Sequence, residues 1–465
     1  MALQIVQRPR YTMLPIGQQI IFAVSDNTIV ATKYKVKYVA QIHVSNEGIN
    51  LSNDDNLIGT FKTTPNNAGV GIFDLRPVLE TFVNPDHEPN STIMPGSISQ
   101  YKGVDASETM FPIHLVDKFS LSNNSVQFFA INFFIEYSEE PTGAVIDFTS
   151  LAPTPSKLYL FFNGVLQYDD VLTLRNNGYG YDLQKFLFDS TSSKFLTDAP
   201  TTQYATLTDY GTFPMLNYEK NALNYPISML NISFYSSAGA YLGSEALGNI
   251  PSNGGVSNAT NNSNQIINYV GAFPANLDGW STVWDTHKAN VGFYTIQDAG
   301  TLSAVYTINI LCPNQKNFEP IRLTWLNRWG TWDYYTFMMK STKSINTKRV
   351  PYSQLGGTWN ESLFKISGYK GGKKNFRVNS TEKIKMNTDF VTEEEGIWFE
   401  QLINSAEVYV LEGFQSDPEF PALNTYVQSA VITGASYIRK TRANDKLMQY
   451  TFEIEKSKMK RTQSV

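Results

Sequence analysis

The sequence predicts a mainly β protein, built from two or three β-sandwich-like domains with a few short helices. Aromatic residues make up 13% of the chain and charged residues 17%, and the second value lies below the usual ~25%. Several segments alternate apolar and polar side chains with the period of two that is typical of strands. We therefore expect helix in less than about a fifth of the chain. Its 465 residues suffice for roughly three domains of ordinary size.

Residues 1–150 are predicted to form an N-terminal β domain. The even positions of residues 33–44 are apolar, which indicates a half-buried antiparallel strand. Between Gly69 and Val83 a strand is followed by Pro77, at a place where the first turn of a short helix tolerates proline. From Phe129 to Tyr137 both faces of the predicted strand are apolar, so this strand should lie between two layers.

Residues 151–251 are predicted to form a middle β domain that opens with a hairpin. Apolar residues flank the pair Asn163 and Gly164 on both sides, and an Asn-Gly pair favours the positive φ angles of a type I′ turn. We place the domain boundary just before this hairpin, at the stretch that contains Pro153 and Pro155.

Residues 252–264 are expected to be an exposed loop or linker, because SNGGVSNATNNSN has no apolar periodicity. Residues 265–465 then form a C-terminal β domain with one capped helix. Thr392 and Glu395 have the T-x-x-E spacing of a capping box. An apolar face follows them, and the helix is expected to end near Asn404.

An aromatic hairpin from Ile321 to Met339 should nucleate the core of the C-terminal domain. Strand-forming residues flank a turn at Asn327–Gly330, and each Trp or Tyr buries roughly 150–250 Å². The same rings could instead form a platform that stacks on sugars. We favour the core, and expect the Trp residues to pack under the capped helix. The predicted core or interface cluster comprises Trp325, Trp329, Trp332, Tyr334, Tyr335 and Trp398.

Charge and cysteine content exclude several classes of protein. The net charge of −5 argues against a nucleic-acid partner, for which a basic face is expected. The run Lys456, Lys458, Lys460 and Arg461 is predicted to be a solvated or interface tail. Cys312 is the only cysteine, so neither an intramolecular disulfide nor a thiolate metal cluster can form. No secretion signal or membrane span is predicted, and we expect synthesis in a cytoplasm.

No motif indicates an enzyme. The four histidines are scattered, with no second His or Cys three or four residues away. Adjacent acidic residues such as Asp169 and Asp170 point to opposite faces of a strand and suit turns better than a glycosidase cleft. The run from Ser367 to Lys374 lacks the pattern of a phosphate loop and is interpreted as a glycine turn with a basic edge. We expect no catalytic residue, cofactor or metal.

A second hypothesis is recognition of a host receptor through glycans. Aromatic side chains that stack on sugars would have to lie in loops rather than in cores. Four of them occur in Gly- and Asn-rich surroundings that favour loops, and are the candidate glycan contacts: Trp280, Trp284, Trp359 and Tyr369.

Seven segments, in this order, resemble structural virion proteins of tailed bacteriophages, particularly phages of marine and Bacteroidetes-type hosts. The resemblance spans nearly the whole chain and is one of texture and order, not of an active-site motif. The segments are GIFDLRPVLETFV (71–83), FFIEYSEEP (133–141), FNGVLQYDD (162–170), SSKFLTDAP (192–200), IRLTWLNRWGTWDYYTF (321–337), TEEEGIWFEQLINSAEVYVLEG (392–413) and KLMQYTFEIE (446–455).

This resemblance implies a tail, baseplate or collar component of the virion. Such a subunit would form a ring of identical copies and act as a scaffold or as an adaptor for fibres, in contact with other tail or collar proteins. Low charge and many aromatic residues suit a subunit with large lateral interfaces.

Overall fold

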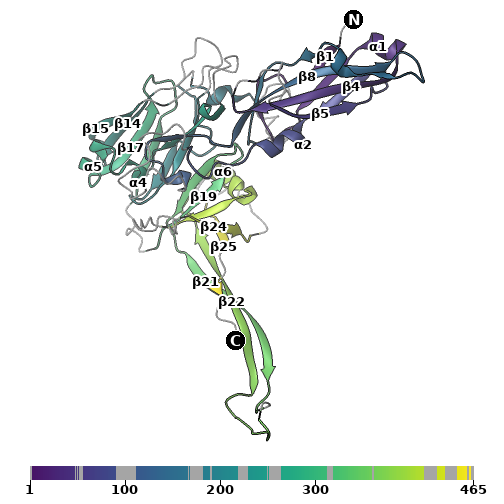
Figure 1. Cartoon of the computed structure of the whole chain (residues 1–465). Coiled ribbons are helices and arrows are strands. Elements are labelled where there is room, and N and C mark those ends of the chain that lie inside the picture. The colour runs from purple at the N-terminus through teal and green to yellow at the C-terminus, as the bar shows by residue number, and fades with distance from the viewer. Residues whose placement is uncertain are drawn as a thin grey trace. The chain divides into compact units, whose positions relative to one another are not determined.

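The protein is mainly β, as the sequence predicts, with 46% strand and 13% helix among the residues that the structure describes. Contacts divide the chain into two compact units (Figure 1). Unit 1 comprises Met1–Leu311, Leu326–Asp333 and Ser416–Leu423, and unit 2 comprises Cys312–Trp325, Tyr334–Gln415 and Asn424–Val465. The structure, a computed structural model, describes all residues except 1–2, 48, 50, 52–55, 91–111, 166, 168–181, 189–190, 218–228, 249, 251–262, 312–317, 359–360, 413–426, 435–447, 458–459 and 462–465.

Two sheets near the N-terminus of unit 1 form a β-sandwich. One has three strands in the order β1-β3-β6, and the other has seven, with β2-β11-β8-β4-β5 as its main path and β9 and β10 on β8. The strands are β1 (Gln4–Gln7), β2 (Met13–Pro15), β3 (Ile21–Ser25), β4 (Tyr34–Ser45), β5 (Leu57–Thr63), β6 (Val70–Asp74), β8 (Val126–Ser138), β9 (Val145–Ile146), β10 (Thr154–Pro155) and β11 (Tyr159–Phe162).

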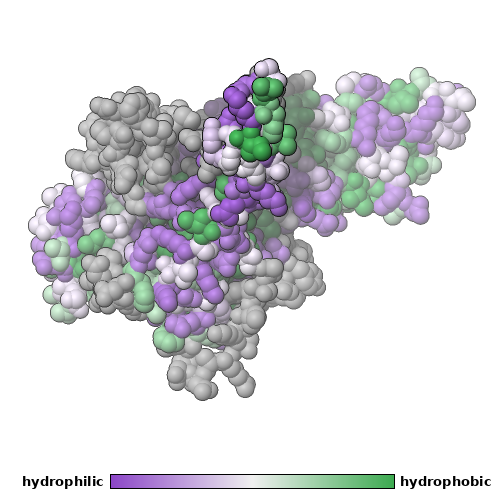
Figure 2. Space-filling model, turned by 90° about the horizontal axis from the view of Figure 1, so that it is seen from below, coloured by the Kyte–Doolittle hydropathy of each residue, from purple (hydrophilic) through white to green (hydrophobic). Residues whose placement is uncertain are grey.

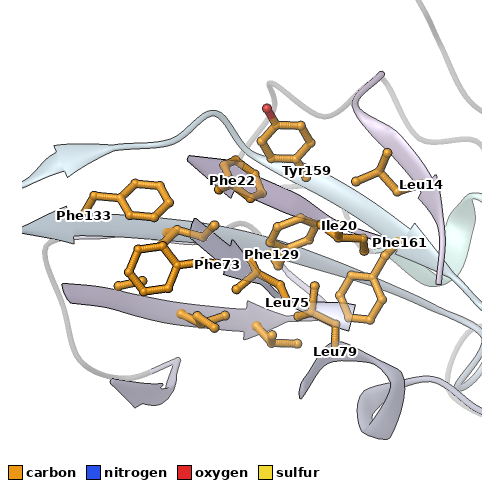
Figure 3. Close-up of a cluster of buried hydrophobic side chains, with 14 of the residues drawn as sticks. Leu14, Ile20, Phe22, Phe73, Leu75, Leu79, Phe129, Phe133, Tyr159 and Phe161 are labelled. Carbon is orange, nitrogen blue, oxygen red and sulfur yellow. The ribbon is translucent and has the colours of Figure 1, made fainter. Parts of the chain in front are cut away.

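The core of this sandwich is rich in aromatic rings (Figure 3). The Phe22 ring of β3 meets Tyr159 of β11 edge to face at 5.5 Å, and Phe129 of β8 stacks on the same Tyr159 ring at 5.3 Å. Both faces of β8 are buried along most of its length. The predicted position of this strand between two layers is therefore confirmed.

The hairpin predicted at Asn163 and Gly164 is wrong, although the strand that leads into it exists. β11 pairs with β8 on one edge and with β2 on the other. Because both of its edges are occupied, β11 cannot also pair with the residues after the turn. β10 and β11 follow the domain boundary predicted at Pro153 and Pro155, and both pair with β8 of the N-terminal sheet.

Two further sheets complete unit 1. The five-stranded sheet has the order β12-β18-β17-β14-β15 and the three-stranded sheet the order β13-β16-β7. The strands are β7 (Phe119–Leu121), β12 (Thr202–Ala205), β13 (Thr212–Leu216), β14 (Leu230–Ser236), β15 (Tyr241–Leu247), β16 (Ile267–Gly271), β17 (Val291–Asp298) and β18 (Tyr306–Ile310).

The described helices of unit 1 are short. Asp26 caps α1 by accepting from the backbone N–H groups of Thr28 and Ile29, and Pro77 lies in the first turn of α2 as predicted. The elements are α1 (Asn27–Thr32), α2 (Arg76–Leu79), α4 (Pro274–Leu277), α5 (Thr282–His287), and the 3₁₀ turns η1 (Glu80–Phe82), η4 (Ile113–Leu115), η5 (Phe148–Ser150), η6 (Leu183–Phe186) and η7 (Ser263–Gln265).

The linker expected at residues 252–264 lies outside the described residues except for its end. There, Ser263 and Asn264 are buried, and the Ser263 hydroxyl donates to the Val126 carbonyl at 2.9 Å. For these two residues the prediction of an exposed loop is wrong, because η7 packs on the sandwich through β8.

Unit 2 contains one eight-stranded sheet and a helix. The sheet has the order β20-β19-β23-β24-β25-β22-β21, with β26 on β22. Helix α6 (Glu393–Asn404) begins with the predicted capping box of Thr392 and Glu395. The strands are β19 (Ile321–Leu326), β20 (Trp332–Phe337), β21 (Thr342–Gln354), β22 (Gly372–Asn387), β23 (Val408–Leu411), β24 (Val427–Ile432), β25 (Thr451–Lys456) and β26 (Lys460–Arg461).

Candidate functional site

The predicted aromatic cluster divides between the two units. In unit 2 the Trp325 ring lies 4.9 Å from Trp398 of α6, and Tyr335 meets Phe399 edge to face at 4.9 Å. Tyr334 is buried under the guanidinium group of Arg322. Trp325 and Tyr335 pack between α6 and the sheet, which is the arrangement expected for Trp325. Tyr334 and Arg322 lie on the other face of the sheet, because successive side chains of a strand point to opposite faces.

Trp329 and Trp332 lie in the turn segment that belongs to unit 1. Trp329 packs edge to face on Phe186 at 4.6 Å, and its Nε1 donates to Asp198. Trp332 is only 1% exposed and lies between the rings of His87 and His114. All three Trp residues are therefore buried, but Trp329 and Trp332 pack on partners other than the predicted helix.

A buried carboxyl group lies beside Trp332. The Asp86 backbone carbonyl accepts from Trp332 Nε1 at 2.7 Å. Its side chain accepts from the backbone N–H groups of Asn123 and Asn124 and from the Tyr269 hydroxyl. Burial raises the pKa of Asp86, and the hydrogen bonds oppose that shift. The hydrogen bonds of this carboxylate connect the segment around Asp86 to segments far away in the sequence, so its role is structural.

The described candidate glycan contacts differ in how exposed their rings are. Trp284 is 1% exposed, and its Nε1 donates to Asp278, so its ring is closed to a sugar. Trp280 is half-buried beneath Lys118. Trp359 lies outside the described residues. Tyr369 is 81% exposed and is the one described candidate that could stack on a ligand.

A small basic pocket opens beside β2 and β11. It has a volume of about 260 Å³, and an anion would be attracted to its three cationic side chains. Those side chains are exposed, however, and one pair of charges 4 Å apart in water gains only about 1 kcal/mol. We assign no ligand to it. The lining residues are Arg8, Pro9, Arg10, Thr12, Lys157 and Tyr159.

The described residues contain no group of three His, Cys, Asp or Glu side chains that could hold a metal ion. His43 and His114 are buried, and His114 packs on Trp332. Among the helices that the structure describes, none is both long and apolar enough to cross a membrane.

The hairpin of β21 and β22, residues 342–387, is the described feature best suited to bind another molecule. We call this hairpin the arm. β21 pairs with β22 from Thr342 opposite Lys385 to Gln354 opposite Gly372. β22 pairs with β25 only from Lys383 onward and with β26 at Asn379 and Ser380. Figure 1 shows the two strands running together away from the rest of the unit 2 sheet.

The arm is exposed on both faces along β21 and along the outer part of β22, from Gly372 to Arg377. Ten consecutive residues of β21, from Thr342 to Pro351, are exposed. In the tip, which comprises the described residues 355–358 and 361–371, Gly357 and Ile366 form an antiparallel bridge. The six most exposed large hydrophobic side chains among the described residues all belong to the arm: Ile366, Tyr369, Leu363, Leu355, Phe364 and Ile345.

The arm is also strongly basic. Residues 342–387 hold ten Lys or Arg and two acidic residues, a net charge of +8 in a chain of net charge −5. Figure 2, seen from below Figure 1 and so toward the tip, shows hydrophobic and hydrophilic residues side by side there.

Of the arm, the sequence pattern predicts only the glycine turn between Ser367 and Lys374. β21 lacks an alternating apolar face because it buries neither side. The signal that could have revealed the arm is the local excess of basic residues.

Comparisons with known proteins assign no family. No protein-family model and no curated protein matches the chain. Trypsin-activated alpha-2-macroglobulin from Escherichia coli aligns at 8% identity over 82% of this chain and 22% of that chain, with a TM-score of 0.18. Salmonella alpha-2-macroglobulin reacted with methylamine aligns at 7% identity over 97% of this chain and 23% of that chain, with a TM-score of 0.19. The chain thus spans less than a quarter of these proteins, and likenesses with TM-scores this low support no inference about fold or function.

Proposed function

We propose that this chain is a structural subunit of a tailed-phage virion, a ring-forming component of the tail, baseplate or collar that acts as scaffold or fibre adaptor. Two observations support the proposal. Seven sequence segments, in this order, resemble such proteins. The exposed arm is suited to bind another protein during assembly. Its partners would be further copies of itself and other tail or collar proteins, and its location the virion.

The exposure of the arm carries the argument for assembly. A two-stranded hairpin without a covering layer is marginally stable in water, yet β21 and β22 extend over 13 and 16 residues. Clusters of exposed apolar side chains on a folded protein mark interaction sites. A hairpin of this length that presents Leu355, Leu363 and Ile366 to solvent is therefore suited to pack on another protein surface.

Mass spectrometry of purified virions tests the proposal. We expect peptides of this chain at a copy number that is a small multiple of the tail symmetry, and immunogold label on one level of the tail or collar. Absence of the chain from purified particles, or its presence only in the lysate, would contradict the proposal.

Recognition of host glycans is a second candidate, supported by the exposure of Tyr369 at the tip. Tyr369→Ala in the virion should lower adsorption to host cells if the tip binds a sugar by stacking. A matched variant, Tyr241→Ala, removes a comparably exposed ring from β15 and should leave adsorption unchanged. Equal adsorption of both variants and of the wild-type virion would exclude this candidate.

A further inference from the structure

We propose that the arm tip docks on a second copy of this chain, on a face formed by Phe390, Glu393, Glu394 and Ile397 at the start of α6. This inference rests on the proposed function in one respect only, because it names the partner that the arm would bind in the assembly. The second copy is identified by three properties of the described residues, namely the chemistry of the tip, the chemistry of the receiving face and the distance between the two in one chain.

The tip combines apolar and positively charged side chains. Leu363, Ile366 and Tyr369 are each at least three-quarters exposed. Lys370 lies in the same turn and Lys373 follows at the start of β22. No acidic side chain pairs with either lysine among the described residues. A surface that fits the tip must therefore offer apolar contact and negative charge together.

The receiving face offers that combination. Phe390 is 60% and Ile397 49% exposed, and Glu393 and Glu394 are exposed beside them. Residues three and four positions apart share one face of a helix, so Ile397 lies next to both glutamates. The capping box uses Glu395, not these two. Trp398 and Phe399 face the core, whereas this outward face is exposed to solvent.

Charge favours a copy of the same chain as the partner. The arm carries +8 and the whole chain −5, so the remainder of the chain carries −13. Complementary potentials steer encounter and exclude partners of like charge. An acidic subunit with one basic arm is thus complementary to itself.

Within one chain the tip cannot reach this face. Phe399 of α6 packs on Phe452 at 5.3 Å, and Phe452 pairs with Met386 at the base of β22. Gly372, where the tip ends, lies at the opposite end of the same strand, roughly 45 Å away at 3.3 Å per residue. The contact must therefore join two copies, and a head-to-tail contact of this kind generates a ring or a filament.

Two other partner classes fit less well. A membrane is the first. Among the described strands β21 pairs with β22 alone, so its outer edge has backbone N–H and C=O groups without a strand partner. Such groups could not enter lipid. A nucleic acid would contact the lysines but leave the apolar tip in water. Both are outcomes of the experiment below.

The experiment is a charge exchange in the full-length protein, followed by sedimentation velocity. We expect the wild-type protein to self-associate, with weaker association as salt rises, because exposed charge pairs are screened. Lys370→Glu with Lys373→Glu should weaken association about tenfold or more, and so should Glu393→Lys with Glu394→Lys, since each 1.4 kcal/mol is tenfold in affinity. A mixture of the two double variants should associate like the wild type, because each supplies the charge that the other requires.

Controls separate docking from folding. Lys157→Glu changes an exposed charge outside the arm and should leave association unchanged. Leu363→Ser with Ile366→Ser removes the apolar part of the contact and should weaken association at any salt concentration, with an unchanged circular dichroism melt. If a charge-reversal double variant has a lowered melting temperature, the same two positions are changed to Gln instead. These Gln substitutions should weaken association by a smaller factor.

Three results would overturn the proposal. The first is association of the mixed variants no stronger than that of either alone. The second is a wild-type protein that stays monomeric at the highest attainable concentration. The third is a monomer that binds phosphatidylglycerol vesicles or a DNA duplex through the tip lysines. Virions that contain the chain, combined with any of these, would leave the proposed function intact and remove this inference alone.

Discussion

Two hairpins follow each other directly in the sequence and have opposite environments. In the first, β19 and β20, nearly every residue is buried. In the second, β21 and β22, most residues are exposed, and the described strand β21 has no buried residue. Both are antiparallel pairs, so strand pairing alone does not explain the difference.

The difference lies in what each hairpin buries. The first is stabilised by its own chain, because rings such as Trp325 and Trp332 each remove a large apolar area from water. The second has Lys, Ser, Thr and Asn along β21 and gains little from burial within its own chain. Substitutions in the first hairpin should therefore change stability, whereas substitutions in the arm should change association.

Trp332→Ala should have the largest effect on stability. Truncation of a buried Trp costs about 3–5 kcal/mol, and the Asp86 carbonyl would also lose its donor. We expect collapse of soluble yield and a melting temperature lower by on the order of ten degrees in the full-length protein. Ile345→Ala, in the exposed arm, is the matched control. A shift of less than a degree or two for Trp332→Ala would show that the comparison of the hairpins is wrong.

Gly330→Ala tests the turn of the first hairpin. Gly330 has φ +74°, and a Cβ atom there would lie 1.7 Å from the Asn163 carbonyl oxygen. The left-handed conformation costs ~1–3 kcal/mol, and the backbone must shift as well, so we expect a loss of about 3 kcal/mol in chemical denaturation. Gly239→Ala is the control, with φ +82° and no atom within 4 Å. Equal losses for the two variants would mean that the close approach is unimportant.

Asp86→Ala should cost about 2 kcal/mol, because one buried donor and two part-buried donors lose their acceptor. Asp86→Asn keeps one acceptor oxygen and should cost less.

The stability of the Asp86→Asn variant should also depend on pH differently from that of the wild type. Burial raises the pKa of Asp86 above its ordinary value of 3.8, so the folded state binds this proton more tightly than the unfolded state. The contribution of Asp86 is therefore fully present below pH 3.8 and is lost as pH rises through the raised pKa.

Urea denaturation of wild type and Asp86→Asn across this pH range checks the sign. Relative to the wild type, the Asn variant should gain stability as pH rises above 3.8. A difference between the two proteins that is constant with pH would contradict the assignment of a raised pKa.

Leu363→Ser with Ile366→Ser should have the smallest effect on stability. Both side chains are exposed in the tip, and surface changes of this kind usually stay within ±0.5 kcal/mol. Denaturation of the protein at a concentration where it is monomeric measures this. A loss above 1 kcal/mol would mean that the tip packs within its own subunit, and would bring the arm closer in character to the first hairpin.

Features set by neighbouring residues could be predicted from the sequence alone. The capping box of Thr392 and Glu395 joins residues three positions apart, so its signal is local and α6 begins where it was predicted. The burial of β8 on both faces follows from its uninterrupted apolar composition. Mainly β content follows from the same short-range alternation of side chains.

Only the tertiary structure decided which distant segments meet. Asn163 and Gly164 favour a hairpin locally, but pairing of β11 with both β2 and β8 leaves no free edge for one. Trp325 and Trp332 look alike in the sequence, yet one packs on α6 and the other between His87 and His114. The arm could not be predicted from apolar periodicity, because such periodicity arises only where one face of a strand is buried within the chain. Contacts between segments far apart depend on which surfaces are already occupied, and no local pattern carries that information.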